Sequence, residues 1–149
     1  MASLSALATL VELATRDADE AAKKLGACVR MREEATQKLA LLVQYRDDYA
    51  LRCQSDMANG IGAAQFNNFQ VFMGKLDQAI AGQRQVVDDL GRRADQARSV
   101  WMACEQKKLT YSTLGERAAL QVLQRENRRD QKANDEFAAR ATQPKLPTP

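Results

Sequence analysis

Residues 55–62 read Ser55-Asp56-Met57-Ala58-Asn59-Gly60-Ile61-Gly62, and this short stretch decides how the chain folds. An Asn-Gly pair with a second glycine nearby is a strong turn signal. The stretch separates two long segments in which apolar residues recur every three or four positions, as on one face of a helix. Because a proline would break a helix and none occurs before Pro144, both segments can be continuous. The sequence therefore predicts two long helices joined by one turn.

The first segment carries a narrow apolar stripe that runs from Leu4 to Cys53 with alternating spacings of three and four residues. Only Arg32 and Arg46 interrupt it. A sustained repeat of this kind places one face of a helix against a partner helix and favours a left-handed supercoil. The first helix is therefore expected to pack along its whole length.

A similar stripe runs through the second segment from Phe69 to Val122, with exceptions at Gln83, Lys108 and Gly115. The segment also contains glycines at positions 74, 82, 91 and 115. Each glycine costs about 1 kcal/mol relative to alanine inside a helix, so bending or fraying is expected there before elsewhere.

These patterns predict an all-α fold, a two-helix antiparallel coiled-coil hairpin in which the second helix is longer. We expect helices over about 4–56 and 63–141, with a turn at about 57–62, forming a single rod over residues 1–143. Residues 144–149 contain all three prolines and are expected to be a flexible, disordered tail.

A turn centred between residues 60 and 61 implies that facing residues have numbers adding to about 121. Side-chain sizes agree with this register, since Trp101 then faces the region of Ala18 and Ala21, and Ala35 faces Val87. Large groups meet small ones, as close packing requires.

The same register pairs Leu4 with a position near 117 and leaves residues 118–140 without an intramolecular partner. Such a helix is on the order of 35 Å long and is marginal alone in water, so we expect it to gain order by binding. A frayed, solvated tail is the alternative.

Residues 105–149 hold 9 basic and 6 acidic side chains, whereas residues 1–104 hold 13 of each. Because acids are interspersed, an acidic protein partner is favoured over nucleic acid.

A second candidate surface lies near the turn, where apolar and aromatic residues of the two helices face each other. Its members, which we call the aromatic stripe, are Leu42, Tyr45, Tyr49, Phe72, Leu76 and Ala79. The alternative is that they form only the thick end of the core. Since Tyr45 and Phe72 lie beside the seams, part of the stripe is expected to be exposed, and exposed aromatic clusters often mark contact surfaces.

Enzymatic chemistry finds little support, because the chain has no histidine. Adjacent acids such as Glu33-Glu34 and Asp88-Asp89 do not share a helix face, and such acids more often lie on a solvated face of the helix.

The cysteines at 28, 53 and 104 lack C-x-x-C spacing and fall on the apolar stripes, so we expect core thiols in a reducing compartment, with no metal or other cofactor. Without a signal or membrane-spanning pattern, the expected location is the cytoplasm.

The chain resembles the FliJ family. The likeness covers nearly the whole chain and rests on the start Met1-Ala2-Ser3-Leu4-Ser5-Ala6-Leu7-Ala8-Thr9-Leu10, the central Leu42-x-x-Tyr45-x-x-x-Tyr49, the Ser55-Asp56-Met57 turn and, most specifically, the ending Glu126-Asn127-Arg128-Arg129-Asp130-Gln131-Lys132-Ala133-Asn134-Asp135-Glu136-Phe137-Ala138-Ala139-Arg140.

That resemblance implies a non-enzymatic component of the bacterial flagellar type III protein-export apparatus, similar in fold to the gamma subunit of F-type and V-type ATPases. It implies binding to the hexameric export ATPase FliI, promotion of its ring assembly, contact with the export-gate membrane protein FlhA, and association with the regulator FliH. Escort of export chaperones is also implied, at the cytoplasmic face of the inner membrane at the flagellar base.

Carried over by residue, the resemblance assigns the aromatic stripe to the gate contact. Lys38 and Gln83 stand where related sequences carry Gln and His, so the polar edge of the stripe differs here. For the ATPase contact, the implied residues are Arg125, Arg128, Arg129, Asp130, Lys132, Asp135, Glu136 and Phe137.

One rival interpretation lies outside this family: a structural coiled-coil homodimer or general adaptor, in which the seams pair between chains. The hairpin instead predicts an elongated monomer, so sedimentation at micromolar concentration distinguishes the two.

Overall fold

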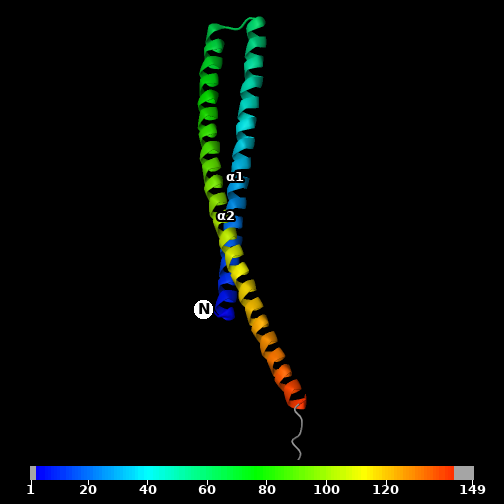
Figure 1. Cartoon of the computed structure of the whole chain (residues 1–149). Helices are drawn as coiled ribbons and strands as arrows, with labels where there is room; N and C mark the ends of the chain where they lie inside the picture. Colours follow the sequence, from blue (N-terminus) through cyan, green and yellow to red (C-terminus); the bar gives the residue numbers. More distant parts are fainter. Residues whose placement is uncertain (1–2, 143–149) are drawn as a thin grey trace, which may run out of the picture. The chain divides into compact units, whose positions relative to one another are not determined.

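The computed structural model describes residues 3–142 of the chain. It contains two helices, α1 over Leu4–Ala58 and α2 over Ala63–Thr142, and no strand among the described residues (Figure 1). With 55 and 80 residues, these helices confirm the predicted all-α hairpin with a longer second helix. The predicted flexible tail, residues 144–149, lies outside the described residues.

Side-chain and backbone hydrogen bonds define where α1 begins and ends. At its start the backbone N–H of Ala6 donates to Oγ of Ser3 over 3.2 Å, a typical N-cap. At its end the N–H of Gly60 donates to the carbonyl of Met57 over 3.2 Å. Gly60 has a φ of +82°, which a residue with a Cβ adopts only at a cost, so the turn depends on this glycine.

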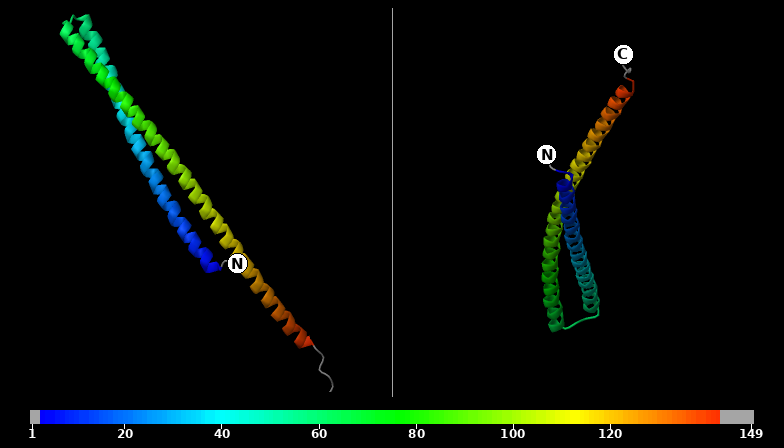
Figure 2. Two further views of the ribbon diagram at one scale, coloured as in Figure 1. Left: turned by 90° about the vertical axis from the view of Figure 1, so that its left-hand side faces the viewer. Right: turned by 90° about the horizontal axis from the view of Figure 1, so that it is seen from below.

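Contacts divide the described chain into two compact units, which we describe separately. The hairpin unit comprises residues 18–103 and includes the turn. The terminal unit comprises residues 3–17 together with residues 104–142. Within the hairpin unit α1 and α2 run antiparallel and side by side, as the views in Figures 1 and 2 agree.

The core of the hairpin unit is a seam between the two helices. Its buried residues are Ala18, Ala21, Ala35, Phe69, Leu76, Ile80, Gly91 and Ala94. On α1 these are all alanines, whereas α2 supplies the larger side chains near the turn. Burying a large apolar side chain contributes about 1.5–3 kcal/mol, so the few large groups of α2 dominate the stability of this unit.

Two arginines that interrupt the apolar stripe of α1 find polar or empty space on α2. The guanidinium of Arg32 lies over Gly91, where an added Cβ would sit 3.6 Å from Cζ of Arg32. The Nε of Arg46 lies 2.5 Å from Oδ1 of Asp77. Both guanidinium groups therefore lie at the edge of the seam, and neither is buried without a partner in its interior.

α2 is one continuous helix through all four of its glycines. The bending or fraying expected at positions 74, 82, 91 and 115 therefore does not interrupt it. The interior positions of a helix this long are held by hydrogen bonds on both sides, so a glycine lowers its stability without ending it.

In the terminal unit the first turns of α1 pack alongside the part of α2 that begins at Cys104. Leu7 and Ala14 are buried there. Along α2 the last half-buried residue is Val122, and every residue of Leu123–Thr142 is exposed. Within this unit the first turns of α1 do not extend along this end of α2, drawn orange to red in Figure 2.

Candidate functional site

The aromatic stripe belongs to the hairpin unit, and its three rings cluster with a fourth, that of Phe69. Tyr49 is central, with its ring centroid 4.6 Å from that of Phe72 and 5.1 Å from that of Phe69. Tyr45 lies 6.4 Å from Phe72 in an edge-on arrangement and 6.4 Å from Tyr49 in a stacked one. Tyr49 and Phe72 have numbers adding to 121, so this contact follows the predicted register.

Burial separates the stripe into a core side and a surface side. Leu76 is only 8% exposed and belongs to the seam. Leu42, Tyr49 and Phe72 are half-buried, while Tyr45 is 54% exposed and Ala79 is also exposed. The surface that a partner can reach therefore centres on Tyr45 and the outer edges of the half-buried rings.

The polar edge of the stripe consists of two residues with different positions. Lys38 is exposed and its ammonium group is available to a partner. Gln83 is half-buried, and its Nε2 donates to the backbone carbonyl of Ala35 over 2.9 Å. Gln83 is thus occupied in joining the two helices, which leaves Lys38 as the charged group at this edge.

The terminal segment, which we define as Leu123–Thr142, is the second candidate surface. It contains all eight residues implied for an ATPase contact, and each of them is exposed. Phe137 is 76% exposed, the highest value among the large apolar residues of the described chain. Full exposure begins about one turn later than position 118, because Ala118 and Val122 are half-buried.

Charge in the terminal segment is mixed: it holds five basic and four acidic side chains. No ion pair within 4.0 Å forms among these described residues. Several like charges instead lie four residues apart, namely Arg125 with Arg129, Glu126 with Asp130 and Arg128 with Lys132. Each such pair destabilises a helix by about 0.2–0.5 kcal/mol, whereas Lys132 with Glu136 and Glu136 with Arg140 place opposite charges at the same spacing.

Residues 3–142 contain no group of three or more His, Cys, Asp or Glu residues that could hold a metal ion. Cys28, Cys53 and Cys104 are half-buried thiols without a disulfide. No described helix has a stretch long and apolar enough to cross a membrane.

One residue of the aromatic cluster was absent from the predicted stripe. Phe69 is 8% exposed, and its ring is tilted against that of Tyr49 in the cluster. It was placed on the seam of the second helix, so its proximity to Tyr49 could have been found by applying the register to the seam as well as to its edge.

Together these features define a two-helix coiled-coil protein whose distinctive parts are exposed helix surfaces. Residues 3–146 match the family model described as flagellar FliJ protein. The chain is 38% identical over 141 residues to the flagellar FliJ protein of Escherichia coli (strain K12), covering 95% of this chain and 96% of that protein. It is 36% identical over 141 residues to the flagellar FliJ protein of Salmonella typhi, with the same coverage.

The chain belongs to the flagellar FliJ protein family, which confirms the resemblance seen in the sequence. The names of the family and of both relatives denote no enzymatic activity. Family membership supports a role as a component of flagellar protein export.

Proposed function

We propose that this chain is a non-enzymatic component of the flagellar type III export apparatus that binds two kinds of protein through two separate surfaces. The observation that carries the proposal is the terminal segment, in which 20 consecutive helical residues, Leu123–Thr142, are all exposed. A helix of this length is marginal in water without packing, so contact with a partner would stabilise it.

The terminal segment binds the export ATPase, FliI, and promotes assembly of its hexameric ring. Phe137 supplies an apolar anchor, and Leu123 adds a second apolar side chain that is 52% exposed. The mixed basic and acidic side chains supply contacts that are selective for a partner with a complementary pattern. The regulator FliH takes part through the same ATPase complex.

Removal of the terminal segment tests this contact. A chain ending at Val122 keeps every residue that is buried or half-buried in α2 and should fold, but its affinity for the ATPase should fall by at least about 100-fold, since both apolar anchors are lost. The point variant Phe137→Ala should weaken binding, whereas Gln131→Ala, another exposed position of the segment, should not. Unchanged affinity of the truncated chain would refute the assignment.

The aromatic stripe contacts the cytoplasmic part of the export gate, FlhA. Tyr45 and Phe72 form the accessible edge of the ring cluster, with centroids 6.4 Å apart. Aromatic rings bury a large area with little loss of side-chain freedom, so they are frequent anchors in protein interfaces.

The double substitution Tyr45→Ala and Phe72→Ala should reduce the affinity for the gate by about 10-fold or more, because a few aromatic anchors often carry most of the binding energy of an interface. The matched control is Leu51→Ala, which removes an apolar side chain that is 65% exposed and lies off the stripe. ATPase binding should be unaffected by all of these variants. If the double variant loses the ATPase and the gate together, the two surfaces are not separate and the proposal is wrong.

The same protein escorts export chaperones and works in the cytoplasm, peripherally at the inner membrane below the flagellum. It acts as a monomer on its own. Sedimentation of the full chain at micromolar concentration tests this last point, since a homodimer would have twice the mass, 33 kDa against 16.6 kDa, and would favour the structural coiled-coil alternative.

A further inference from the structure

One side of the hairpin unit has an unusual composition. The positions that border the seam on this side repeat every seven residues on each helix. On α1 they are Lys24, Met31, Lys38, Tyr45 and Arg52, and on α2 they are Phe72, Ala79, Val86, Arg93 and Val100. Four of these side chains are basic, six are apolar or aromatic, and none is acidic.

Contacts establish that the two rows lie on the same side. At the end near the turn, the rings of Tyr45 and Phe72 meet at 6.4 Å. Farther from the turn, Lys24, Arg93 and Val100 line one open groove with a volume of about 420 Å³. The rows therefore flank one continuous face of the hairpin unit.

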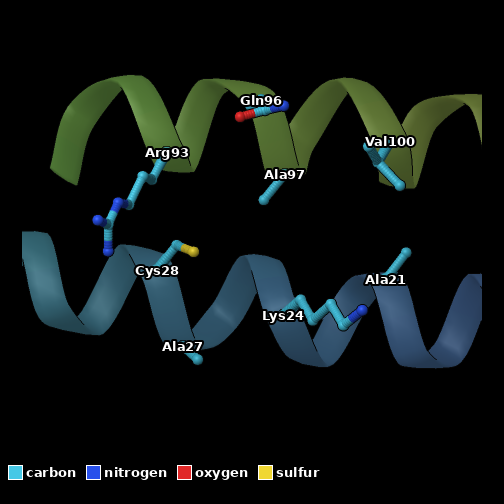
Figure 3. Close-up of a pocket in the computed structure, with 8 residues that line it drawn as sticks. All are labelled: Ala21, Lys24, Ala27, Cys28, Arg93, Gln96, Ala97 and Val100. Atoms are coloured by element: carbon cyan, nitrogen blue, oxygen red, sulfur yellow. The ribbon is translucent and has the colours of Figure 1, made fainter. Parts of the chain in front are cut away.

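The groove is hollow because its floor is made of small side chains. Ala21 and Cys28 of α1 point toward α2, and Ala97 of α2 points toward α1 (Figure 3). Arg93 extends from α2 toward α1 beside Cys28, while Val100 borders the groove from the α2 side. An apolar floor between basic edges is the shape that the side chains of a third helix can enter.

Apolar residues on this face are well exposed. Met31 is 49% exposed, Val86 is 44% exposed and Val100 is 52% exposed. Positions that border the seam of a two-helix coiled coil usually carry charges that pair between the helices. On the opposite side of this unit the bordering positions include an acid, Asp77, which pairs with the seam residue Arg46, whereas the rows that contain Lys24 and Arg93 include no acid.

We propose that the part of this face farther from the turn, defined by Lys24, Met31, Val86, Arg93 and Val100 and called the basic groove, binds an amphipathic α-helix of another protein whose apolar stripe is bordered by acidic residues. From Val86 to Val100 is 14 residues, or about 21 Å of helix, so the partner helix needs roughly four turns. The basic groove shares no residue with the aromatic stripe and is a surface additional to the two already assigned.

Charge and polarity select this occupant over others. A second copy of the chain placed on the same face would bring its own basic rows against these and be repelled. Nucleic acid would use the basic residues but leave Met31, Val86 and Val100 without a role. An acidic amphipathic helix satisfies both the apolar floor and the basic edges.

The experiment uses the full chain and a labelled helical peptide of about three heptads, with leucine at the two seam positions and glutamate at the bordering ones. Fluorescence anisotropy measures its affinity. Lys24→Glu with Arg93→Glu should weaken binding by about tenfold or more. The matched control is Arg84→Glu with Arg98→Glu, which makes the same change in charge at exposed positions on the opposite side of the unit.

A second variant tests the apolar requirement. Val86→Ser with Val100→Ser should also weaken binding of the acidic peptide, and a peptide carrying lysine in place of glutamate should not bind the unmodified chain. Circular dichroism checks that each variant keeps its helix content. Equal losses in the two charge variants, retained binding by the serine variant, or no saturable binding to the unmodified chain would each overturn the proposal.

Discussion

Two glycines in α2 cost stability without serving the fold. At Gly74 and at Gly82 an added Cβ would meet nothing within 4 Å. Both positions lie inside a continuous helix, where alanine is favoured over glycine by about 1 kcal/mol. Gly74→Ala and Gly82→Ala should therefore each raise the free energy of unfolding of the hairpin unit by about that amount.

The double variant should gain about 2 kcal/mol, because the two positions are eight residues, or roughly 12 Å, apart and share no contact. Gly60→Ala is the control with the opposite sign. Gly60 has a φ of +82°, and a left-handed conformation costs a residue with a Cβ about 1–2 kcal/mol, so this variant should lose stability.

Urea unfolding of the full chain, followed by the fluorescence of Trp101, gives the measurement. Trp101 is the single tryptophan and belongs to the same unit as both glycines. If the double variant gains less than about 0.5 kcal/mol, or if Gly60→Ala is as stable as the original chain, the account of these positions as plain helix and left-handed turn is wrong.

Other substitutions in the hairpin unit have expected effects that differ in size. Asp77→Asn should cost only about 0.2–1 kcal/mol, because Arg46 and Asp77 are 41% and 53% exposed, and the cost should shrink at high salt in urea titrations. Ala94→Leu should cost about 1–3 kcal/mol by overfilling the seam, since Ala94 is 2% exposed, and its loss should appear as a lower melting temperature. Gln83→Ala should cost about 1 kcal/mol by removing the hydrogen bond to Ala35, and a gain in stability would contradict that bond.

The turn and the register were predictable because both depend on local sequence. Asn59-Gly60 gives a turn signal, and the structure places the left-handed residue at Gly60. Once the turn is fixed, the facing pairs follow by counting along two helices of equal rise. The observed contacts keep to this register within about one turn: Gln83 bonds to Ala35, whose numbers add to 118, and Tyr49 meets Phe72 at 121.

Details of the polar residues in the seam were not predictable from spacing. Arg32 and Gly91 were both noted in the sequence, one as an interruption and the other as a cost, but spacing alone does not say which way a long side chain turns. The recess over Gly91 that receives Arg32 depends on the tilt of the helices and on rotamers. For the same reason the spacing marks Gln83 only as an exception to the apolar stripe and does not predict its bond to Ala35.

The sequence predicts the terminal segment but not the basic groove. The unpaired end of α2 followed from unequal helix lengths, and the structure moves its fully exposed part only from about 118 to Leu123. The apolar stripes do not indicate the basic groove, because they consist of seam positions and the groove is bordered by the positions beside the seam. A count of charges by heptad position reveals the two rows that contain Lys24 on α1 and Arg93 on α2.

The recess at Gly91 has a consequence for how the two helices find each other. Arg84 and Arg98 lie seven residues on either side of Gly91. If α1 slid along α2 by one heptad in either direction, Arg32 would leave an empty recess and meet one of these arginines, so like charges would repel and the slide would be reversed. After any local opening, the two helices therefore return to a single register, because Arg32 fits only beside Gly91.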